Sequence, residues 1–147
     1  MKWVVNIMKK INQISAGGIV YKDNLWLICQ HSQHKGWVFP KGLVGDRDSG
    51  ESMEKAALRE VEEEGGIKAK IVYNKPVKVG YKYSFKGNLI EKTVYYFLME
   101  YVSGDPSQHD WEMSQSKFVT KEKIIKTLTY KSDQKAFEKV LDLFNNI

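Results

Sequence analysis

The sequence predicts an α/β (α+β) fold, in which most of the chain forms strands and a few segments form helices. Several segments are rich in Val, Ile, Tyr and Phe and are separated by short polar turns, which is typical of strands. Other segments space their apolar residues as helices do. The length of 147 residues, 42% of them hydrophobic, suits one core, so we expect a single domain over residues 1–147.

The boundaries of the elements follow from turn residues and helix stops. We expect strands over 13–21, 25–31, 67–73, 77–85, 89–102 and 112–119, with a short apolar piece at 37–39. Residues 41–50 are rich in Gly, Asp and Ser and predict a loop. Helical segments are expected over 51–64, where a double glycine follows, over a short turn at 121–127, and over 133–145.

The first twelve residues predict an N-terminal extension or an added edge strand. Their apolar stretch from Trp3 to Met8 is too short for a signal-peptide core or a membrane span. We therefore expect a cytoplasmic protein without a membrane partner. The single cysteine, Cys29, lies in the apolar run 25–29 and is expected to be a buried structural thiol.

The charge of the chain is unevenly distributed. The whole sequence carries a formal net charge of +5, whereas residues 51–64 contain six acids and only two bases. A concentrated acidic spot within a basic surround is what a metal-bridged phosphate site requires. This distribution therefore indicates a phosphate-containing partner that binds through a cation.

The glutamates near the end of the 51–64 helix share one face. Residues three and four apart lie on the same side of a helix, so Glu60, Glu63 and Glu64 form one stripe. Arg59, four residues before Glu63, can pair with these carboxylates and hold them in place. Mg²⁺ prefers oxygen ligands and often combines one or two carboxylates with substrate phosphates, while a remaining carboxylate can deprotonate water. The stripe thus predicts a magnesium site with hydrolytic chemistry.

A solvated, charged helix face is the alternative interpretation of a run of glutamates. The spacing around the run argues against it. The pattern G-x5-E-x7-R-E-U-x-E-E-x-G-U, in which U is aliphatic, is met at every fixed place: Gly45, Glu51, Arg59, Glu60, Val61, Glu63, Glu64, Gly66 and Ile67. This string resembles the Nudix box, the signature of the Nudix hydrolase family.

The resemblance implies a central mixed sheet between helices, with the box forming a loop, a helix and a loop that bind a divalent metal. It also implies hydrolysis of a nucleoside diphosphate linked to another group, by attack of water on phosphorus. Mg²⁺ is the expected cofactor, and Mn²⁺ is the alternative. The glutamates that match the family's metal-binding and water-activating acids are Glu60, Glu63 and Glu64. Glu51 and Arg59 match the residues that brace the loop and orient those acids.

The first glycine of the box can be assigned in two ways. The segment 39–42, Phe-Pro-Lys-Gly, resembles the place where many relatives carry that glycine, but Gly42 lies nine residues before Glu51 instead of six. Either Gly45 takes the role, or the loop carries three extra residues, and we favour the insertion. In that register Gly42 can lend a backbone carbonyl to the metal, and Lys41 can meet phosphate oxygens.

Three segments, 15–18, 92–98 and 128–130, resemble the asymmetric diadenosine tetraphosphate hydrolases of this family. Those enzymes split a dinucleoside tetraphosphate into a nucleoside triphosphate and a monophosphate. A long polyphosphate needs several cations, for which the candidates are His31, Lys35, Lys41 and Lys92. Adenine needs flat partners, for which the candidates are Tyr81, Tyr83 and Tyr130. The alternative for each residue is an ordinary solvated or half-buried position.

A further acid and other functions stay open at this point. The segment 109–113 resembles the family's loop that brings another glutamate toward the metals, which makes Glu112 a candidate ligand or base; the alternative is an exposed loop acid. Other possible functions are a (d)NTP pyrophosphohydrolase, an RNA 5′-end pyrophosphohydrolase acting on a nucleic acid partner, and a non-catalytic nucleotide-binding module. The complete set of box residues argues against the last. The sequence leaves the oligomeric state open.

Overall fold

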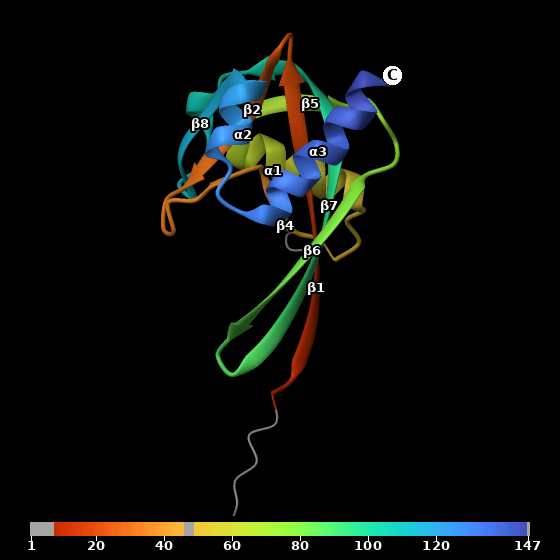
Figure 1. Ribbon diagram of the computed structural model, residues 1–147, viewed down its shortest axis with the longest axis vertical. Coiled ribbons are helices and arrows are strands. Elements are labelled where there is room, and N and C mark those ends of the chain that lie inside the picture. The colour runs from red at the N-terminus through yellow and green to blue at the C-terminus, as the bar shows by residue number, and fades with distance from the viewer. Residues whose placement is uncertain (1–7, 46–48, 147) are drawn as a thin grey trace, which may run out of the picture.

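The computed structural model describes residues 8–45 and 49–146, in which eight strands form one mixed sheet. In chain order the elements are β1 (Lys10–Lys22), β2 (Leu25–His31), β3 (Trp37–Val38), β4 (Lys41–Leu43), α1 (Met53–Gly65), β5 (Ile67–Ile71), β6 (Val77–Phe85), β7 (Asn88–Gly104), the 3₁₀ turn η1 (Pro106–Gln108), β8 (Met113–Thr120), α2 (Lys121–Thr127) and α3 (Lys131–Asn145). The predicted α/β (α+β) fold with a central mixed sheet is confirmed (Figure 1).

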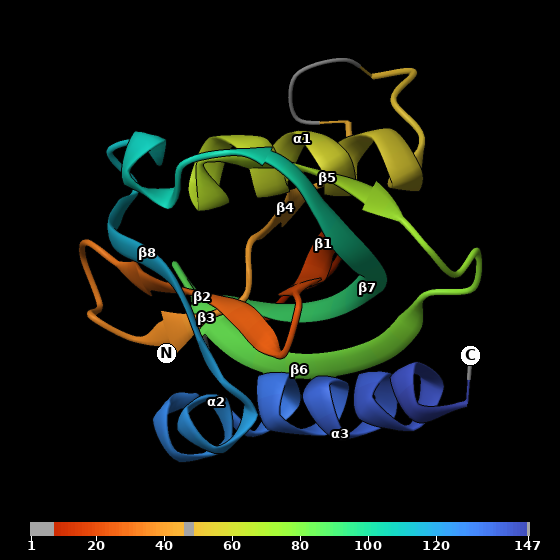
Figure 2. The same ribbon diagram turned by 90° about the horizontal axis from the view of Figure 1, so that it is seen from above.

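Helices cover both faces of the sheet. α1 lies on one face, and α2 and α3 lie on the other (Figure 2). Neighbouring residues of the central strands alternate between the two layers: Ile19 packs in the core that includes Phe137 of α3, and Val20 packs in the core that includes Val61 of α1. Strands that are buried on both faces need apolar side chains at successive positions. This explains the continuous apolar runs in the sequence.

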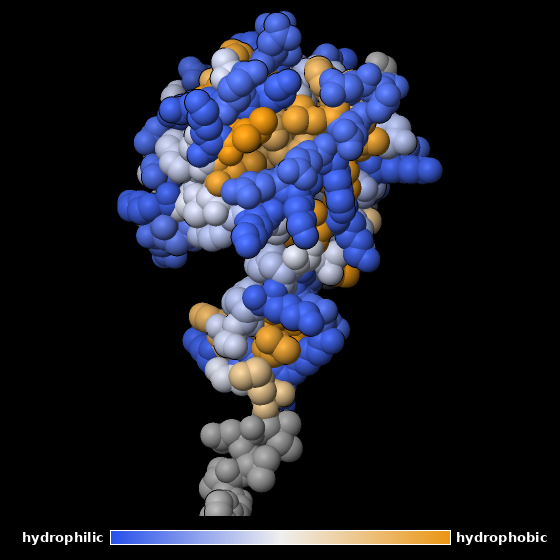
Figure 3. All heavy atoms as spheres, in the orientation of Figure 1, coloured by the Kyte–Doolittle hydropathy of each residue, from blue (hydrophilic) through white to orange (hydrophobic). Residues whose placement is uncertain are grey.

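β1 and β7 form the centre of the sheet and run parallel, with Lys10 paired to Leu89 and Tyr21 paired to Glu100. β6 pairs antiparallel with β7 across the predicted turn at 86–88. Beyond the helices these three strands continue as a narrow arm (Figures 1 and 3). Apolar side chains on the arm, such as Ile14 and Phe85, are half-exposed.

The prediction of a loop over residues 41–50 is wrong for its first three residues. Residues 41–43 form β4, which pairs antiparallel with β1 at Ser15–Gly17. The turn-rich composition of the segment does not reveal this pairing, because it depends on the free edge that β1 offers there. Gly17 permits the close approach, since a side-chain carbon at this position would overlap the backbone oxygen of Pro40.

Of the predicted N-terminal extension or added edge strand over residues 1–12, only the last five residues lie within the described part of the chain. Residues 10–12 extend β1 three positions before its expected start and pair with β7. Residues 1–7, with most of the apolar stretch that starts at Trp3, lie outside the described residues, as do 46–48 and 147.

Cys29 is fully buried, as expected of a structural thiol, and its Sγ lies 3.6 Å from the backbone oxygen of Glu64. Burial raises the pKa of this thiol to about 12. In the described parts of the chain, no helix has the length and apolarity needed to cross a membrane.

Candidate active site

α1 carries the glutamates and has well-defined ends. Its N-cap is Ser52, whose side chain accepts a hydrogen bond from the backbone N–H of Lys55. At the other end Gly66 has a φ of +79°, the left-handed conformation that glycine adopts most easily. A side chain at Gly66 would also overlap backbone atoms of Asp105 and His109. The double glycine therefore stops the helix and lets the loop before β8 pack against it.

Arg59 holds three of the acids together. Its Nε and Nη2 donate to the two carboxylate oxygens of Glu51 at 2.8 and 3.0 Å. Its Nη1 donates to Glu60 at 2.8 Å and to Glu63 at 3.3 Å. The planar guanidinium allows this forked pairing, which a lysine ammonium does not reproduce. Glu51 thus holds Arg59, and Arg59 orients two acids of the predicted metal site.

Gly42 and Gly45 both shape the loop that leads to α1. The backbone of Gly42 lies so close to Glu60 that a side-chain carbon would overlap the carboxylate. Gly45 has a φ of +82°, and its backbone hydrogen-bonds the carboxylate of Glu51. This placement favours the assignment of Gly42 as the first glycine of the box, followed by three extra loop residues. Gly42 lies beside the acids, and Gly45 lies within the loop that Glu51 braces.

Two of the three acids are buried. Glu60 and Glu64 are 5% and 4% exposed, whereas the side chain of Glu63 is 31% exposed. A charged side chain on a helix face is expected to lie outside the core, and for Glu64 this expectation is wrong. β4 covers Glu64, and the backbone N–H of Lys41 donates to its Oε1 at 3.1 Å. Burial raises the pKa of Glu60 to about 7 and that of Glu64 to about 9, and Glu112 contributes to both shifts.

The chemistry of this donor set fits a hard divalent cation. Glu60, Glu63 and Glu64 offer carboxylate oxygens, and the backbone of Gly42 lies beside Glu60. Among the described residues no three His, Cys, Asp or Glu side chains already converge on one point, and Arg59 holds Glu60 and Glu63. Mg²⁺ needs only one or two carboxylates besides waters and phosphates, and its charge would offset the burial of ionised acids.

The buried acids make the stability of the metal-free protein depend on pH. In the unfolded chain a glutamate titrates near its ordinary pKa of 4.5, whereas Glu64 in the folded chain keeps its proton to about pH 9. The folded state therefore binds more protons across this range, and the free energy of unfolding falls as the pH rises. We expect a lower Tm at pH 9 than at pH 6 in EDTA, and a larger increase in Tm on adding Mg²⁺ at pH 9.

Thermal unfolding followed by intrinsic fluorescence measures both effects. The Glu64→Gln variant lacks the acid with the larger shift, so its Tm in EDTA should depend less on pH. A variant with the pH profile of the wild type would contradict the assignment of the effect to Glu64.

A cavity of about 260 Å³ opens beside the buried acids. Its polar lining combines residues of the box with predicted substrate contacts: Ser15, His31, Lys41, Gly42, Glu64, Lys92 and Glu112. Glu112 thus reaches the acids from another part of the chain. Burial, followed by the charge of Lys41, lowers the pKa of Lys92, which places two ammonium groups near each other. A cavity lined by both acids and cations suits a phosphate chain bridged to the acids by a metal ion.

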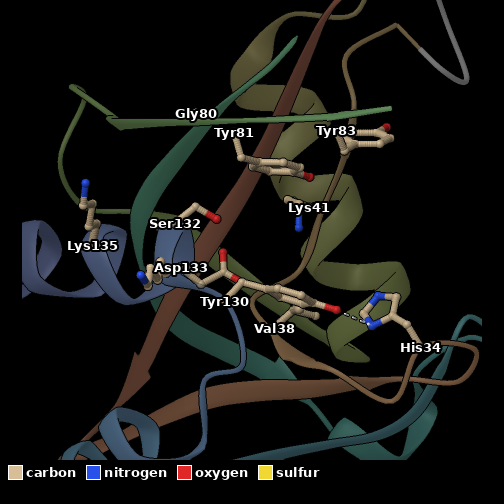
Figure 4. Close-up of a pocket in the computed structure, with 11 residues that line it drawn as sticks. His34, Val38, Lys41, Gly80, Tyr81, Tyr83, Tyr130, Ser132, Asp133 and Lys135 are labelled. Carbon is tan, nitrogen blue, oxygen red and sulfur yellow. Dashed lines mark hydrogen bonds between the residues drawn. The ribbon is translucent and has the colours of Figure 1, made fainter. Parts of the chain in front are cut away.

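A second cavity of about 630 Å³ is lined by aromatic rings. Tyr81 and Tyr83 of β6 lie on one side, with ring centroids 5.9 Å apart, and Tyr130 lies on the other side (Figure 4). The hydroxyl of Tyr130 lies 3.0 Å from Nδ1 of His34, whose ring stacks on His31 at 4.1 Å. The two cavities share His34, Val38, Lys41 and Tyr81, so they form one continuous cleft.

One predicted contact is not brought into this cleft. Lys35 adopts a φ of +62° in the turn before β3 and lines neither cavity. Other lining residues were not predicted: His34, Lys131, Ser132, Asp133 and Lys135. His34 could have been proposed from its place beside His31 in a turn. The residues of α3 carry no such signal, because only the packing of α3 against β6 brings them to the cavity.

A comparison with protein families gives the identity of the fold. The model of the NUDIX domain matches residues 11–141. This chain belongs to the Nudix family. The match extends from β1 into α3 and confirms the resemblance inferred from the box.

Solved Nudix structures resemble the chain over most of its length. An Ap4A hydrolase from C. elegans, in a binary complex, is 26% identical with a TM-score of 0.74, over 92% of this chain and 99% of that one. A Nudix hydrolase from Nitrosomonas europaea has the same fold, with 17% identity and a TM-score of 0.67 over 89% of each chain. The first likeness supports the predicted Ap4A hydrolase branch.

A curated relative is longer than this chain. The Mycobacterium tuberculosis (strain CDC 1551 / Oshkosh) protein that bears the name mutator protein MutT4 is 25% identical over 150 residues. The alignment covers 95% of this chain and 59% of that protein, so this chain spans about three fifths of the relative's length.

Proposed function

We propose that this Nudix protein is a magnesium-dependent hydrolase that cleaves diadenosine tetraphosphate into ATP and AMP. The observation that carries the proposal is the continuity of the cleft, in which the acidic cavity and the aromatic cavity share Lys41 and Tyr81. A dinucleoside polyphosphate has the same order of chemical parts, with an anionic chain that ends in a flat base. The likeness to the C. elegans Ap4A hydrolase supports this substrate class.

In the proposed reaction the acids of α1 would hold Mg²⁺, together with the carbonyl of Gly42. When bound, this ion would neutralise phosphate charge and lower the pKa of a water molecule. Arg59 keeps Glu60 and Glu63 in position, and Glu64 contributes a third carboxylate. The partly buried ion pair between Arg59 and Glu51 keeps this arrangement rigid before the substrate binds.

Proton transfer is assigned to Glu112, which lines the same cavity as Glu64. Glu112 accepts a proton from the water whose oxygen attacks phosphorus. The phosphorus–oxygen bond of the anhydride then breaks, and the leaving phosphate oxygen keeps the electron pair. Lys41, Lys92 and His31 face the polyphosphate, and Lys41 and Lys92 offset its charge. The base lies among Tyr81, Tyr83 and Tyr130.

Incubation with diadenosine tetraphosphate and Mg²⁺, followed by anion-exchange chromatography, tests the proposal. We expect ATP and AMP in equal amounts, no turnover in EDTA, and recovery of turnover when Mg²⁺ or Mn²⁺ is restored. Two molecules of ADP would contradict the assigned cleavage. Release of pyrophosphate from a (d)NTP or from 5′-triphosphorylated RNA, without cleavage of the dinucleotide, would replace the proposed substrate with one of those.

A further inference from the structure

Asp133 lines the aromatic cavity and has no part in the reaction proposed above. It lies in the first turn of α3 and is only 2% exposed. Its Oδ1 accepts a hydrogen bond from the hydroxyl of the buried Tyr96 at 2.7 Å. Within residues 8–45 and 49–146, its Oδ2 has no hydrogen-bond partner. A buried acceptor without a partner is unfavourable in free energy. A hydrogen-bond donor on a bound ligand would remove this cost.

The position of Asp133 indicates where that donor would come from. In Figure 4 one of its carboxylate oxygens points toward the space between Tyr81 and Tyr130. Burial, Tyr83 and Asp133 together raise the pKa of Tyr81 to about 12, in keeping with a carboxylate close to that phenol. Burial raises the pKa of Asp133, while Lys41, which also lines the cavity, and the Tyr96 hydroxyl act in the opposite direction. In its ionised form this carboxylate can only accept hydrogen bonds.

We propose that Asp133 is a specificity residue, whose free oxygen accepts a hydrogen bond from the 6-amino group of a purine held between Tyr81 and Tyr130. The inference rests on the proposed function in one respect, that the occupant is a nucleotide. Stacking on tyrosine tolerates any base, because every base has a π-face. A buried acceptor discriminates between bases. Hypoxanthine and guanine carry an oxygen at position 6 in place of the amino group, and they would leave Oδ2 unpaired.

Isothermal titration of the full chain with AMP and with IMP, without metal, tests the inference. We expect AMP to bind at least about tenfold more tightly, as the loss of one buried hydrogen bond implies. Equal affinities, or tighter binding of IMP, would overturn it. In Asp133→Asn the amide oxygen can still accept from Tyr96, while the amide N–H groups face the base. The preference for AMP should then disappear or invert in favour of IMP.

Two further variants separate recognition from a merely structural role. Asp142→Asn makes the same chemical change at an exposed position of α3 and should keep the preference for AMP. Tyr96→Phe removes the partner of Oδ1 but keeps the free acceptor. If Asp133 served only to anchor Tyr96, Asp133→Asn and Tyr96→Phe would both lower the Tm, and neither would change the ratio of affinities.

The design also separates this inference from the proposed function. Selective binding of AMP by a protein that does not cleave diadenosine tetraphosphate would reject the substrate and keep the role of Asp133. Cleavage of the dinucleotide with equal affinities for AMP and IMP would reject that role and keep the substrate. Should Asp133→Asn fail to fold, the comparison of AMP with IMP on the wild type decides alone.

Discussion

Replacing Glu64 by glutamine is expected to lower kcat for diadenosine tetraphosphate by about 10²- to 10⁴-fold, while the protein stays folded. Glutamine keeps the oxygen that accepts the backbone N–H of Lys41, so the change removes the ability to ionise and bind a cation, and little else. Because burial raises the pKa of Glu64 to about 9, the loss of this acid should leave the metal-free protein at least as stable at neutral pH. The effect should therefore appear in catalysis rather than in folding.

Steady-state kinetics and thermal unfolding of the same preparations check this expectation. Glu62→Gln is the matched control, because Glu62 lies on the same helix but is exposed to solvent, and it should keep the rate of the wild type. Glu63→Gln should also reduce turnover strongly. If Glu63→Gln and Glu64→Gln both turned over substrate at the wild-type rate, the assignment of the metal site to α1 would be wrong.

Replacing Arg59 by alanine should affect both stability and activity. The change leaves Glu51 and Glu60 without their cation, although both side chains are only 7% exposed. Removing one partner of a well-buried ion pair typically destabilises a protein by about 3 kcal/mol or more. We expect a decrease of about 3 kcal/mol in the free energy of unfolding, and a fall in kcat of at least about 10²-fold, because Glu60 and Glu63 lose their orientation.

Urea denaturation and kinetics on Arg59→Ala, Arg59→Lys and Lys55→Gln separate the contributions. Lysine supplies a charge but not the fork that reaches Glu51 and Glu60 together, so Arg59→Lys should recover part of the stability and little of the activity. Lys55, exposed one turn earlier on α1, serves as a control for the loss of a positive charge. Full activity of Arg59→Lys would show that charge alone is sufficient.

The features predicted correctly from the sequence are mostly local ones. The spacing of Glu60, Glu63 and Glu64 fixes them on one side of α1, since helical geometry depends only on neighbouring residues. Gly66 ends this helix because its left-handed conformation is a property of the single residue. The resemblance to the Nudix box predicted the family, and membership of that family predicted the central mixed sheet.

The features that were missed depend on distant parts of the chain. The burial of Glu64 follows from β4, a strand that forms because β1 has a free edge beside it. From the sequence, Asp133 is predicted to be an ordinary acid of an amphipathic helix. Only the fold places its carboxylate beside Tyr96, which lies 37 residues earlier in the chain. Lys35 was a candidate for the polyphosphate from its charge and its place in a loop, but it lies in the turn before β3 and lines neither cavity.

The parallel pairing at the centre of the sheet has a consequence for how the chain reaches its native state. Segment 10–21 finds its parallel partner in segment 89–100, so no sequential growth of local contacts can complete the sheet. The chain must close this large loop before any contact offsets the loss of conformational entropy. This requirement slows folding. During synthesis, the edge of β1 that pairs with β7 must therefore stay unpaired until most of the polypeptide has left the ribosome.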